Sequence, residues 1–377
     1  MNYILTLAGF SQSISISASQ ILLGVMIISS FWFIYKEGDF EIFKTRLFVC
    51  FCLLYAAVGL SLLFTNPTPD ITKNVKIFWG MTYLFTAILL VTDKTKLRLI
   101  MNSIVAGGAF AASYAIIQYF LFDSERAIGF MTHALTFGNS IVMIAVLCLF
   151  TITENRFESR SEKIFFYTAL PLLIISLVLS GSRGPILALP MTAAILLIIK
   201  FRFKGLAYAC ILGAAVIAAI AFTPSINERF SRIISDEYKV SSSSIGTRIV
   251  LWKTSLKIIR DNPVFGIGYG NFRKTVNKYT DKTLASKAHA HNSFLQQAVS
   301  YGLTGLTALM IFFGVLWQEI MKTVKRKIPY SYGVLAAFIA FLICGLTENN
   351  LGDSEVAMLM WLLSGSVIGI MFNGDSA

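Results

Sequence analysis

Residues 47–64 read LFVCFCLLYAAVGLSLLF, a run of apolar and small side chains without a single charge. An α-helix of about 20 such residues spans the hydrocarbon core of a bilayer and satisfies its own backbone hydrogen bonds there. Ten further apolar runs follow the same pattern, at 19–35, 75–91, 99–122, 140–152, 164–180, 185–199, 206–222, 293–317, 328–346 and 356–372. The sequence therefore predicts eleven membrane-spanning helices, and residues 2–10 are a candidate for a short, incomplete twelfth.

The composition supports this fold class. Of 377 residues, 56% are hydrophobic and 14% are charged, and the mean hydropathy is +0.70. A soluble domain carries about a quarter of charged residues, so an ordinary soluble globular protein is excluded. We expect an all-α, polytopic integral membrane protein with about 12 transmembrane helices.

Metal and cofactor sites are not predicted. All five cysteines fall inside predicted spans, where they act as small apolar packing residues, and none stands at metal-binding spacing from a histidine. Zinc held by His133, His289 and His291 is disfavoured, because these residues lack a local metal-ligand spacing. We therefore expect no metal, no cofactor and no disulfide.

The short loops divide into a basic and a less basic side. Sixteen Lys and Arg residues lie in the loops at 36–46, 94–98, 156–163, 200–204 and 322–327, whereas the short loops of the other side hold only four. Basic short loops stay in the cytoplasm, so the first side is predicted to be cytoplasmic, together with the C-terminus. The long segment 223–301 then faces outward. The chain divides into N-terminal helices (1–222), an outer loop with the candidate catalytic motif (223–292) and C-terminal helices (293–377).

The outer loop is strongly basic. Between 223 and 301 it carries twelve Lys and Arg residues against five acids, and such a field attracts phosphate, pyrophosphate or lipid headgroups. For most of its lysines we expect only a solvated surface. Apolar residues recur at helical spacing and predict a helix over 247–260. Arg248 would lie in its first turn, where a cation opposes the helix dipole; a bound phosphate and a contact with lipid headgroups explain it equally well.

A second basic site lies in the turn SGSRGP at 180–185. Arg183 stands at the membrane boundary and Pro185 is expected to start a helix, so the turn combines a cation with the positive end of a helix dipole. This pair suits a phosphate, and an arginine that only reaches for headgroups is the alternative. Arg126 and His133, in the outer loop 123–139, are weaker candidates.

Two of only three histidines stand in HAHNSFL at 289–295, just before a predicted span. Imidazole titrates near neutral pH, and among so many cations at a membrane boundary it indicates proton transfer on an anionic, lipid-linked substrate. We favour His291 over His289 as the base, because Asn292 and the apolar residues after it lead into the span. The acids of the last outer loop could orient a histidine or hold a sugar hydroxyl, although ordinary solvation is the preferred interpretation for Glu348, Asp353 and Glu355.

These residues resemble a family signature. His291-Asn292, separated by nine residues from Gly302 and then followed by Gly305, resembles the signature of the bacterial O-antigen ligases. Arg183, with Leu187 four residues later, resembles their second signature.

The outer loop resembles the same superfamily. The stretch GTR at 246–248, the pair NP at 262–263 and the glycine turn at 266–270 resemble the large periplasmic loop of O-antigen ligases and polymerases. One large outer loop before the last three spans also fits that architecture.

The resemblance implies a fold, a location and a reaction. The fold would be of the membrane glycosyltransferase type (GT-C-like), in the bacterial inner membrane, with the active site on the periplasmic side. The enzyme would be an O-antigen ligase of lipopolysaccharide biosynthesis. It would transfer O-polysaccharide from undecaprenyl pyrophosphate to a sugar hydroxyl of lipid A–core, with inversion and without a metal. Its partners would be this donor, this acceptor and membrane lipids, with no nucleic acid.

The resemblance also implies residue roles. His291 would be the general base that removes the acceptor proton. Arg183 and Arg248 would bind the pyrophosphate and stabilise the charge that develops as it leaves. Arg126, His289 and Asn292 would complete the substrate-binding site.

Other functions compete with this one. An O-antigen polymerase would use lipid-linked repeat units as acceptor with nearly the same site, and the spacings around Arg183 and His291 favour the ligase. A protein O-oligosaccharyltransferase is disfavoured, because such relatives tend to carry a further soluble region after the last span. A transporter of the lipid-linked glycan would need ionisable residues deep inside its spans, where this chain has almost none. A purely structural membrane protein would not explain the clustering of Arg and His on one side.

Overall fold

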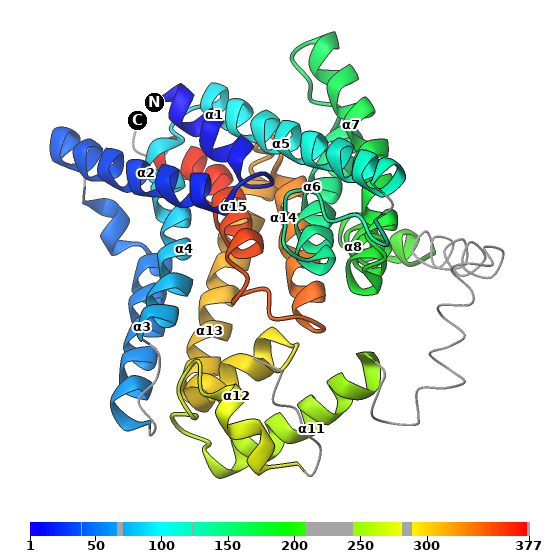
Figure 1. The fold of residues 1–377 in the computed structure, drawn as a ribbon. Helices are drawn as coiled ribbons and strands as arrows, with labels where there is room; N and C mark the ends of the chain where they lie inside the picture. Colours follow the sequence, from blue (N-terminus) through cyan, green and yellow to red (C-terminus); the bar gives the residue numbers. More distant parts are fainter. Residues whose placement is uncertain (39, 66–70, 123, 208–243, 281–288, 375–377) are drawn as a thin grey trace.

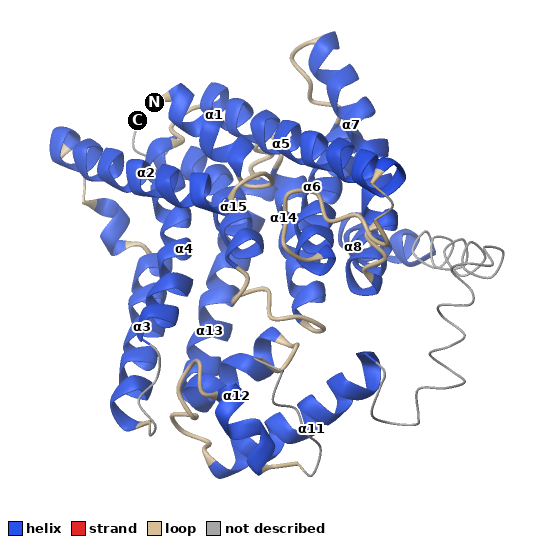
Figure 2. Cartoon of the chain, in the orientation of Figure 1, coloured by secondary structure: helices blue, strands red, loops and turns tan. Residues whose placement is uncertain are grey.

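The structure is a computed structural model that describes residues 1–38, 40–65, 71–122, 124–207, 244–280 and 289–374. Every regular element in these ranges is a helix, and Figure 2 shows no strand among them. The elements are α1 (Asn2–Ser11), α2 (Ile16–Glu37), η1 (Glu41–Lys44), α3 (Arg46–Phe64), α4 (Ile71–Leu90), α5 (Lys94–Leu121), α6 (Ala134–Glu154), α7 (Arg160–Leu179), α8 (Arg183–Phe201), α11 (Ser244–Asp261), α12 (Phe272–Thr275), η2 (Val276–Lys278), α13 (Ser293–Lys325), α14 (Ser331–Gly345) and α15 (Ser354–Gly374).

The predicted all-α membrane protein is confirmed. Within the described ranges, 8 helices are long and apolar enough to cross a membrane, and the apolar helices Phe78–Leu90 and Ser331–Gly345 are shorter. These helices correspond to ten of the eleven predicted spans, while most of the predicted span 206–222 lies outside the described residues. The N-terminal candidate is the ten-residue helix α1, which packs on α5: a Cβ at Gly107 would lie only 2.3 Å from the backbone oxygen of Phe10.

Helix ends follow from local hydrogen bonding. The side chains of Ser15, Thr45, Asp93 and Ser159 cap the N-termini of α2, α3, α5 and α7 by accepting a backbone N–H of the first turn. Two boundaries differ clearly from the predicted ones. Helix α6 begins at Ala134, before the predicted 140, and α13 continues to Lys325 across a non-helical residue, Gly302 (φ 69°, ψ −170°).

The core lies where α6, α14 and α15 meet their neighbours in the middle of Figure 1. Small residues let these helices approach closely. A Cβ at Gly365 of α15 would lie 2.3 Å from the backbone oxygen of Leu84 in α4, and one at Gly333 of α14 would lie 2.9 Å from that of Leu147 in α6. Close backbone approach is the usual way in which membrane helices associate, and it fixes the loops that these helices carry.

The two ends of the helix bundle carry different polar clusters. At the end where α6 stops and α7 starts, Arg98 pairs with Glu158 and Glu162, and the hydroxyl of Tyr330 donates to Glu162 at 2.9 Å. Arg98, Glu158 and Glu162 belong to the short loops predicted to share the cytoplasm, whereas Tyr330 falls inside the predicted span 328–346. At the other end, the loops before α6, before α13 and between α14 and α15 come together, next to α11 and α12 (Figure 1).

Candidate active site

The backbone break at Gly302 anchors the outer segment to the membrane helices. At φ 69° a side chain would be strained, and a Cβ there would lie 2.1 Å from the backbone oxygen of Val264. The freed backbone groups pair with the incoming segment: Leu303 N–H donates to Pro263 O at 2.7 Å, and Ile267 N–H donates to Val299 O at 2.9 Å. The glycine of the sequence signature is therefore the point where residues 263–268 lock onto α13.

The start of α13 holds the last outer loop. The Oδ1 atom of Asn292 accepts the backbone N–H of Phe294 and Leu295, so Asn292 caps the helix, while its Nδ2 donates to Leu346 O at 2.9 Å. The Ser293 hydroxyl donates to Glu348 O at 3.0 Å. Both groups of the Asn292 amide thus connect backbone segments, and Asn292 is not among the residues that line the cavity described below.

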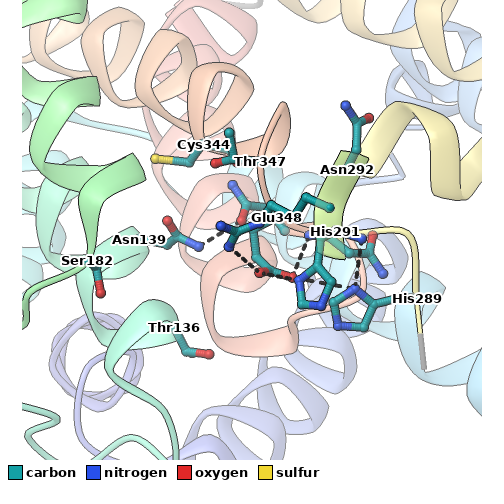
Figure 3. Close-up of polar contacts among 12 residues, drawn as sticks. Thr136, Asn139, Ser182, His289, His291, Asn292, Cys344, Thr347 and Glu348 are labelled. Carbon is teal, nitrogen blue, oxygen red and sulfur yellow. Dashed lines mark hydrogen bonds and ion pairs between the residues drawn. The ribbon is translucent and has the colours of Figure 1, made fainter. Parts of the chain in front are cut away.

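His291 and Glu348 form the closest polar pair of the site. Nδ1 of His291 lies 2.9 Å from Oε2 of Glu348, and Nδ1 of His289 lies 3.5 Å from Oε1 of the same carboxyl group. Figure 3 shows both imidazole rings facing Glu348, with ring centroids 4.2 Å apart. His291 adopts φ 50°, an uncommon value for a residue other than glycine, and this backbone turn directs its ring toward Glu348.

The hydrogen bonds distinguish the two histidines. A carboxylate only accepts, so Nδ1 of His291 carries the proton toward Glu348 and Nε2 is left unprotonated in the neutral ring. Nδ1 of His289 instead accepts the backbone N–H of His291 at 3.2 Å, which leaves the proton of the neutral ring on Nε2. This assignment follows from the hydrogen-bond partners. In the neutral ring, Nε2 of His291 can therefore accept a proton.

Glu348 is ionised in this setting. Its side chain is buried, and burial raises the pKa of its carboxyl group, but the hydrogen bond from His291 and the positive charges that His291 and His289 carry when protonated outweigh this and hold the pKa below its usual range. The backbone N–H of Asn349 also donates to Glu348 at 3.0 Å. A fixed negative charge behind His291 favours a protonated imidazole during proton transfer.

Arg248 reaches the same carboxyl group from α11. Its Nη2 lies 4.0 Å from Oε2 of Glu348. The predicted place of Arg248 in the first turn of its helix is wrong, because α11 begins at Ser244 and not at 247. Arg248 therefore does not oppose the helix dipole at the first turn. The nearby carboxyl group of Glu348 explains why a cation lies at this position.

Arg183 begins α8 at the same end of the bundle. The helix starts at Arg183 itself, with Ser182 as its N-cap, rather than at the predicted Pro185. A Cβ on the next residue, Gly184, would lie 2.9 Å from Oγ1 of Thr347. The positive end of α8 therefore abuts the residue that precedes Glu348.

Arg126 fixes the turn in front of Arg183. Its Nε donates to Ser180 O at 2.7 Å and its Nη2 donates to the Ser182 hydroxyl at 2.9 Å, which in turn donates to Ala134 O at 2.8 Å. Arg126 thereby ties the loop before α6 to the start of α8.

A cavity of about 800 Å³ opens between these loops. Its wall includes four groups of residues from distant parts of the chain: Arg126, His133 and Thr136; Tyr269 and Arg273; His289 and His291; and Glu348, Asp353 and Glu355. Arg183 and Arg248 are not lining residues. Arg248 lies close to Glu348 of the wall, and Gly184, the residue after Arg183, lies close to Thr347. The volume is sufficient for a ligand of several sugar rings or a pyrophosphate with its sugar.

One acid of the wall joins two helices. The Thr136 hydroxyl of α6 donates to Oδ2 of Asp353, at the N-terminus of α15, at 2.7 Å. Burial, followed by the neighbouring carboxyl group of Glu355, raises the pKa of Asp353 to about 8. Asp353 therefore carries a proton at neutral pH for most of the time, unlike Glu348.

The preference for solvated acids in the last outer loop was wrong for Glu348, which is only 8% exposed and bonded to a histidine. The separation of 57 positions between His291 and Glu348 hides this pairing in the sequence. The sequence feature that could have indicated this pairing is the group of acids in the last outer loop, which has no basic residue and lies on the same predicted side of the membrane as the two histidines. Arg273 of the cavity wall is one of the twelve basic residues of the outer loop, and nothing in the sequence singles it out.

A metal ion has one candidate position among the described residues. The ligand atoms of His289, His291 and Glu348 lie within 4.8 Å of one another. The carboxylate of Glu348 already has protein partners, since it lies 2.9 Å from Nδ1 of His291 and 4.0 Å from Nη2 of Arg248. The donor set thus fits a protein hydrogen-bond network at least as well as a cation.

Comparisons with known proteins agree with the geometry. The chain is 27% identical over 233 residues to an uncharacterized protein of Haemophilus influenzae, an overlap of 57% of this chain and 58% of that protein. It is 22% identical over 340 residues to the O-antigen ligase of Salmonella typhimurium, covering 84% of this chain and 81% of that enzyme. Residues 168–310 match the model of the family described as O-Antigen ligase. This range runs from α7 to α13 and contains Arg183, Arg248 and both histidines, and over it the chain is similar to the O-antigen ligase family.

Proposed function

We propose that this protein is an O-antigen ligase that transfers O-polysaccharide from undecaprenyl pyrophosphate to a sugar hydroxyl of lipid A–core. The similarity to the O-antigen ligase family supports a glycosyl-transferring enzyme of the ligase and polymerase type. The single observation that carries the finer proposal is the His291–Glu348 pair at 2.9 Å in the wall of a cavity wide enough for sugars. In this pair His291 can act as the general base, and Glu348 orients its ring.

In the proposed reaction the acceptor hydroxyl attacks the anomeric carbon of the donor sugar. Its proton passes to Nε2 of His291, while the bond from the anomeric carbon to the pyrophosphate oxygen breaks on the opposite face. This direct displacement inverts the anomeric configuration. Glu348 holds the His291 ring in the required tautomer and stabilises the imidazolium that forms.

The leaving group is a pyrophosphate, whose charge grows as the bond breaks. We assign its stabilisation to Arg183 and Arg248, because Arg248 lies beside Glu348, Arg183 precedes the Gly184 that packs on Thr347, and each offers a planar guanidinium that binds phosphate oxygens in a bidentate way. The start of α8 adds the partial positive charge of a helix N-terminus. Arg126 supports this seat through its bonds to Ser180 and Ser182.

The proposed enzyme needs no metal ion and works at the periplasmic face of the inner membrane. The basic short loops near Arg98, Arg156 and Lys327 would then lie in the cytoplasm, at the end of the bundle opposite the cavity. The lipid-linked donor arrives already activated, which suits a wall of arginines and histidines.

The deciding experiment is a lipopolysaccharide gel from a host without this gene, beside the same host complemented with wild-type protein or with His291→Ala. A ligase is supported by loss of capped core while long lipid-linked polymer accumulates, with rescue by wild type only. Core that carries a single repeat unit would identify a polymerase instead. An unchanged ladder in the deletion strain would refute both.

A further inference from the structure

The proposed reaction assigns His291, Glu348 and the arginines, but it leaves one wall of the cavity without a role. That wall consists of Thr136 of α6, Tyr269 of the segment after α11 and Asp353 at the start of α15. Tyr269 supplies the aromatic ring of the cavity wall. It lies nearly parallel to Tyr301 behind it, with an angle of 10° between the rings and 6.1 Å between their centroids, so its orientation is fixed by packing.

An aromatic ring beside a carboxyl group matches the chemistry of a sugar. The apolar face of a sugar ring packs on an aromatic ring, and its hydroxyl groups pair with a group that both donates and accepts hydrogen bonds. Asp353 fits this requirement because the Thr136 hydroxyl occupies its Oδ2 at 2.7 Å and holds the carboxyl group in one orientation.

Charge determines which sugar belongs here. The arginines assigned to the pyrophosphate, Arg183 and Arg248, do not line this wall. The wall is therefore suited to the neutral part of the substrate pair that lies away from the leaving group. Because His291 is the proposed base for the attacking hydroxyl, the sugar that lies near it is the acceptor sugar.

We propose that Tyr269, Thr136 and Asp353 form the subsite for the acceptor sugar, in which Asp353 hydrogen-bonds its hydroxyl groups and thereby places the attacking oxygen near His291. This inference rests on the proposed function, since it assumes that the cavity binds two glycans and that His291 is the base. It assigns Asp353 to recognition of the acceptor and not to proton transfer.

The protonation state of Asp353 strengthens the argument. Because its pKa is raised to about 8 by burial and by Glu355, the group donates as well as accepts at neutral pH and adds no negative charge to the path of an anionic donor. The charged or titratable groups that share the cavity with it are Glu355, Glu348, His133, Arg126, Arg273, His289 and His291. Above pH 8 Asp353 loses its donor, so the KM for the acceptor rises while the KM for the donor changes less.

The test uses the purified full chain with undecaprenyl-pyrophosphate-linked polymer as donor and lipid A–core as acceptor, and measures the two KM values separately. Asp353→Leu and Tyr269→Leu are expected to raise the acceptor KM about tenfold, the effect of losing roughly 1.4 kcal/mol of binding, and to leave the donor KM within about twofold. Asp353→Asn keeps a neutral hydrogen-bonding group, so it should retain the acceptor KM at pH 7 and lose its rise above pH 8.

Asp93→Asn is the matched control, because Asp93, like Asp353, directly precedes a helix, in its case α5, but at the other end of the bundle. A merely structural role of Asp353 would lower the yield of folded protein or kcat without moving the acceptor KM, and that result overturns the inference. A rise in donor KM alone also overturns it. Failure of the proposed function is a separate result: wild type would then transfer nothing to lipid A–core. If it extends lipid-linked repeat units instead, the same comparison is made with the lipid-linked acceptor strand.

Discussion

Nδ1 of His291 lies 2.9 Å from Oε2 of Glu348, although 57 residues separate them in the chain. Three contacts create this pair: Asn292 bonded to Leu346 O, Ser293 bonded to Glu348 O, and Asn349 N–H bonded to the Glu348 carboxyl group. The first turn of α13 and the loop between α14 and α15 are therefore one unit. The effects of substituting His291 and Glu348 on the reaction rate should therefore be coupled.

The first prediction concerns this coupling. His291→Ala is expected to lower transfer by about 10³-fold, since it removes the base, and Glu348→Gln by about 10²-fold, since it removes the charge that orients the ring. The double variant should be no slower than His291→Ala alone, because the two residues act as one unit. The readout is the rate of transfer to lipid A–core by purified enzyme.

Glu162→Gln is the control for the Glu348 variant. Glu162 is also a buried acid in a polar cluster, with Arg98 and Tyr330, but at the other end of the bundle. This variant should lose thermal stability and keep kcat. If Glu348→Gln behaves in the same way as Glu162→Gln, the pair is structural and the assigned role is wrong.

The second prediction concerns Arg183. Arg183→Lys keeps the positive charge but loses the planar, bidentate geometry, so kcat/KM for the donor should fall by about tenfold or more, the loss expected for one strong hydrogen bond to a charged group. Arg202→Lys, at the opposite end of the same helix, should have no effect. Equal activity of the two variants would show that Arg183 only contacts lipid headgroups.

The third prediction concerns metal ions. His289, His291 and Glu348 could hold a cation by distance alone, but the proposed mechanism uses the His291–Glu348 hydrogen bond directly. Dialysis against EDTA should therefore leave the transfer rate unchanged, measured before and after metal is added back. Loss of activity that is restored by zinc would mean that these three residues are metal ligands and that His291 is not a free base.

The sequence was sufficient for the membrane architecture and for part of the site. Apolar runs of helical length and the distribution of Lys and Arg depend on local composition, and for this reason α2, α3 and α5 begin and end within a few residues of the predicted spans. The grouping of Arg183, Arg248 and His291 at one end follows from counting spans. None of these steps requires knowledge of a specific contact.

Contacts between side chains far apart in the chain could not be predicted from the sequence. Nothing local distinguishes Glu348 from Asp353, yet one is bonded to His291 and ionised while the other is bonded to Thr136 and carries a proton. The difference arises from which loop each one faces. Arg248 shows the same limit, because its helix starts three residues earlier than predicted and its position reflects a contact with Glu348.

The last prediction concerns the glycine of the signature. Gly302 adopts φ 69°, and a Cβ there would meet Val264 O at 2.1 Å and Val264 C at 2.3 Å. Both atoms belong to backbone, which cannot move aside as a flexible side chain would. Gly302→Ala is therefore expected to destabilise the protein by about 2 kcal/mol or more, and to lower activity as well, since residues 263–268 carry Tyr269 and Arg273 toward the cavity.

Gly314→Ala is the matched control on the same helix. A Cβ at Gly314 would meet nothing within 4 Å, and alanine is the better helix former by roughly 0.5–1 kcal/mol. This variant should keep its activity and show an unchanged or slightly higher Tm in detergent, whereas Gly302→Ala should show a lower one. If both variants had the same Tm and activity, the outer segment would not depend on the break in α13, and the signature glycine would need a different explanation, such as direct contact with substrate.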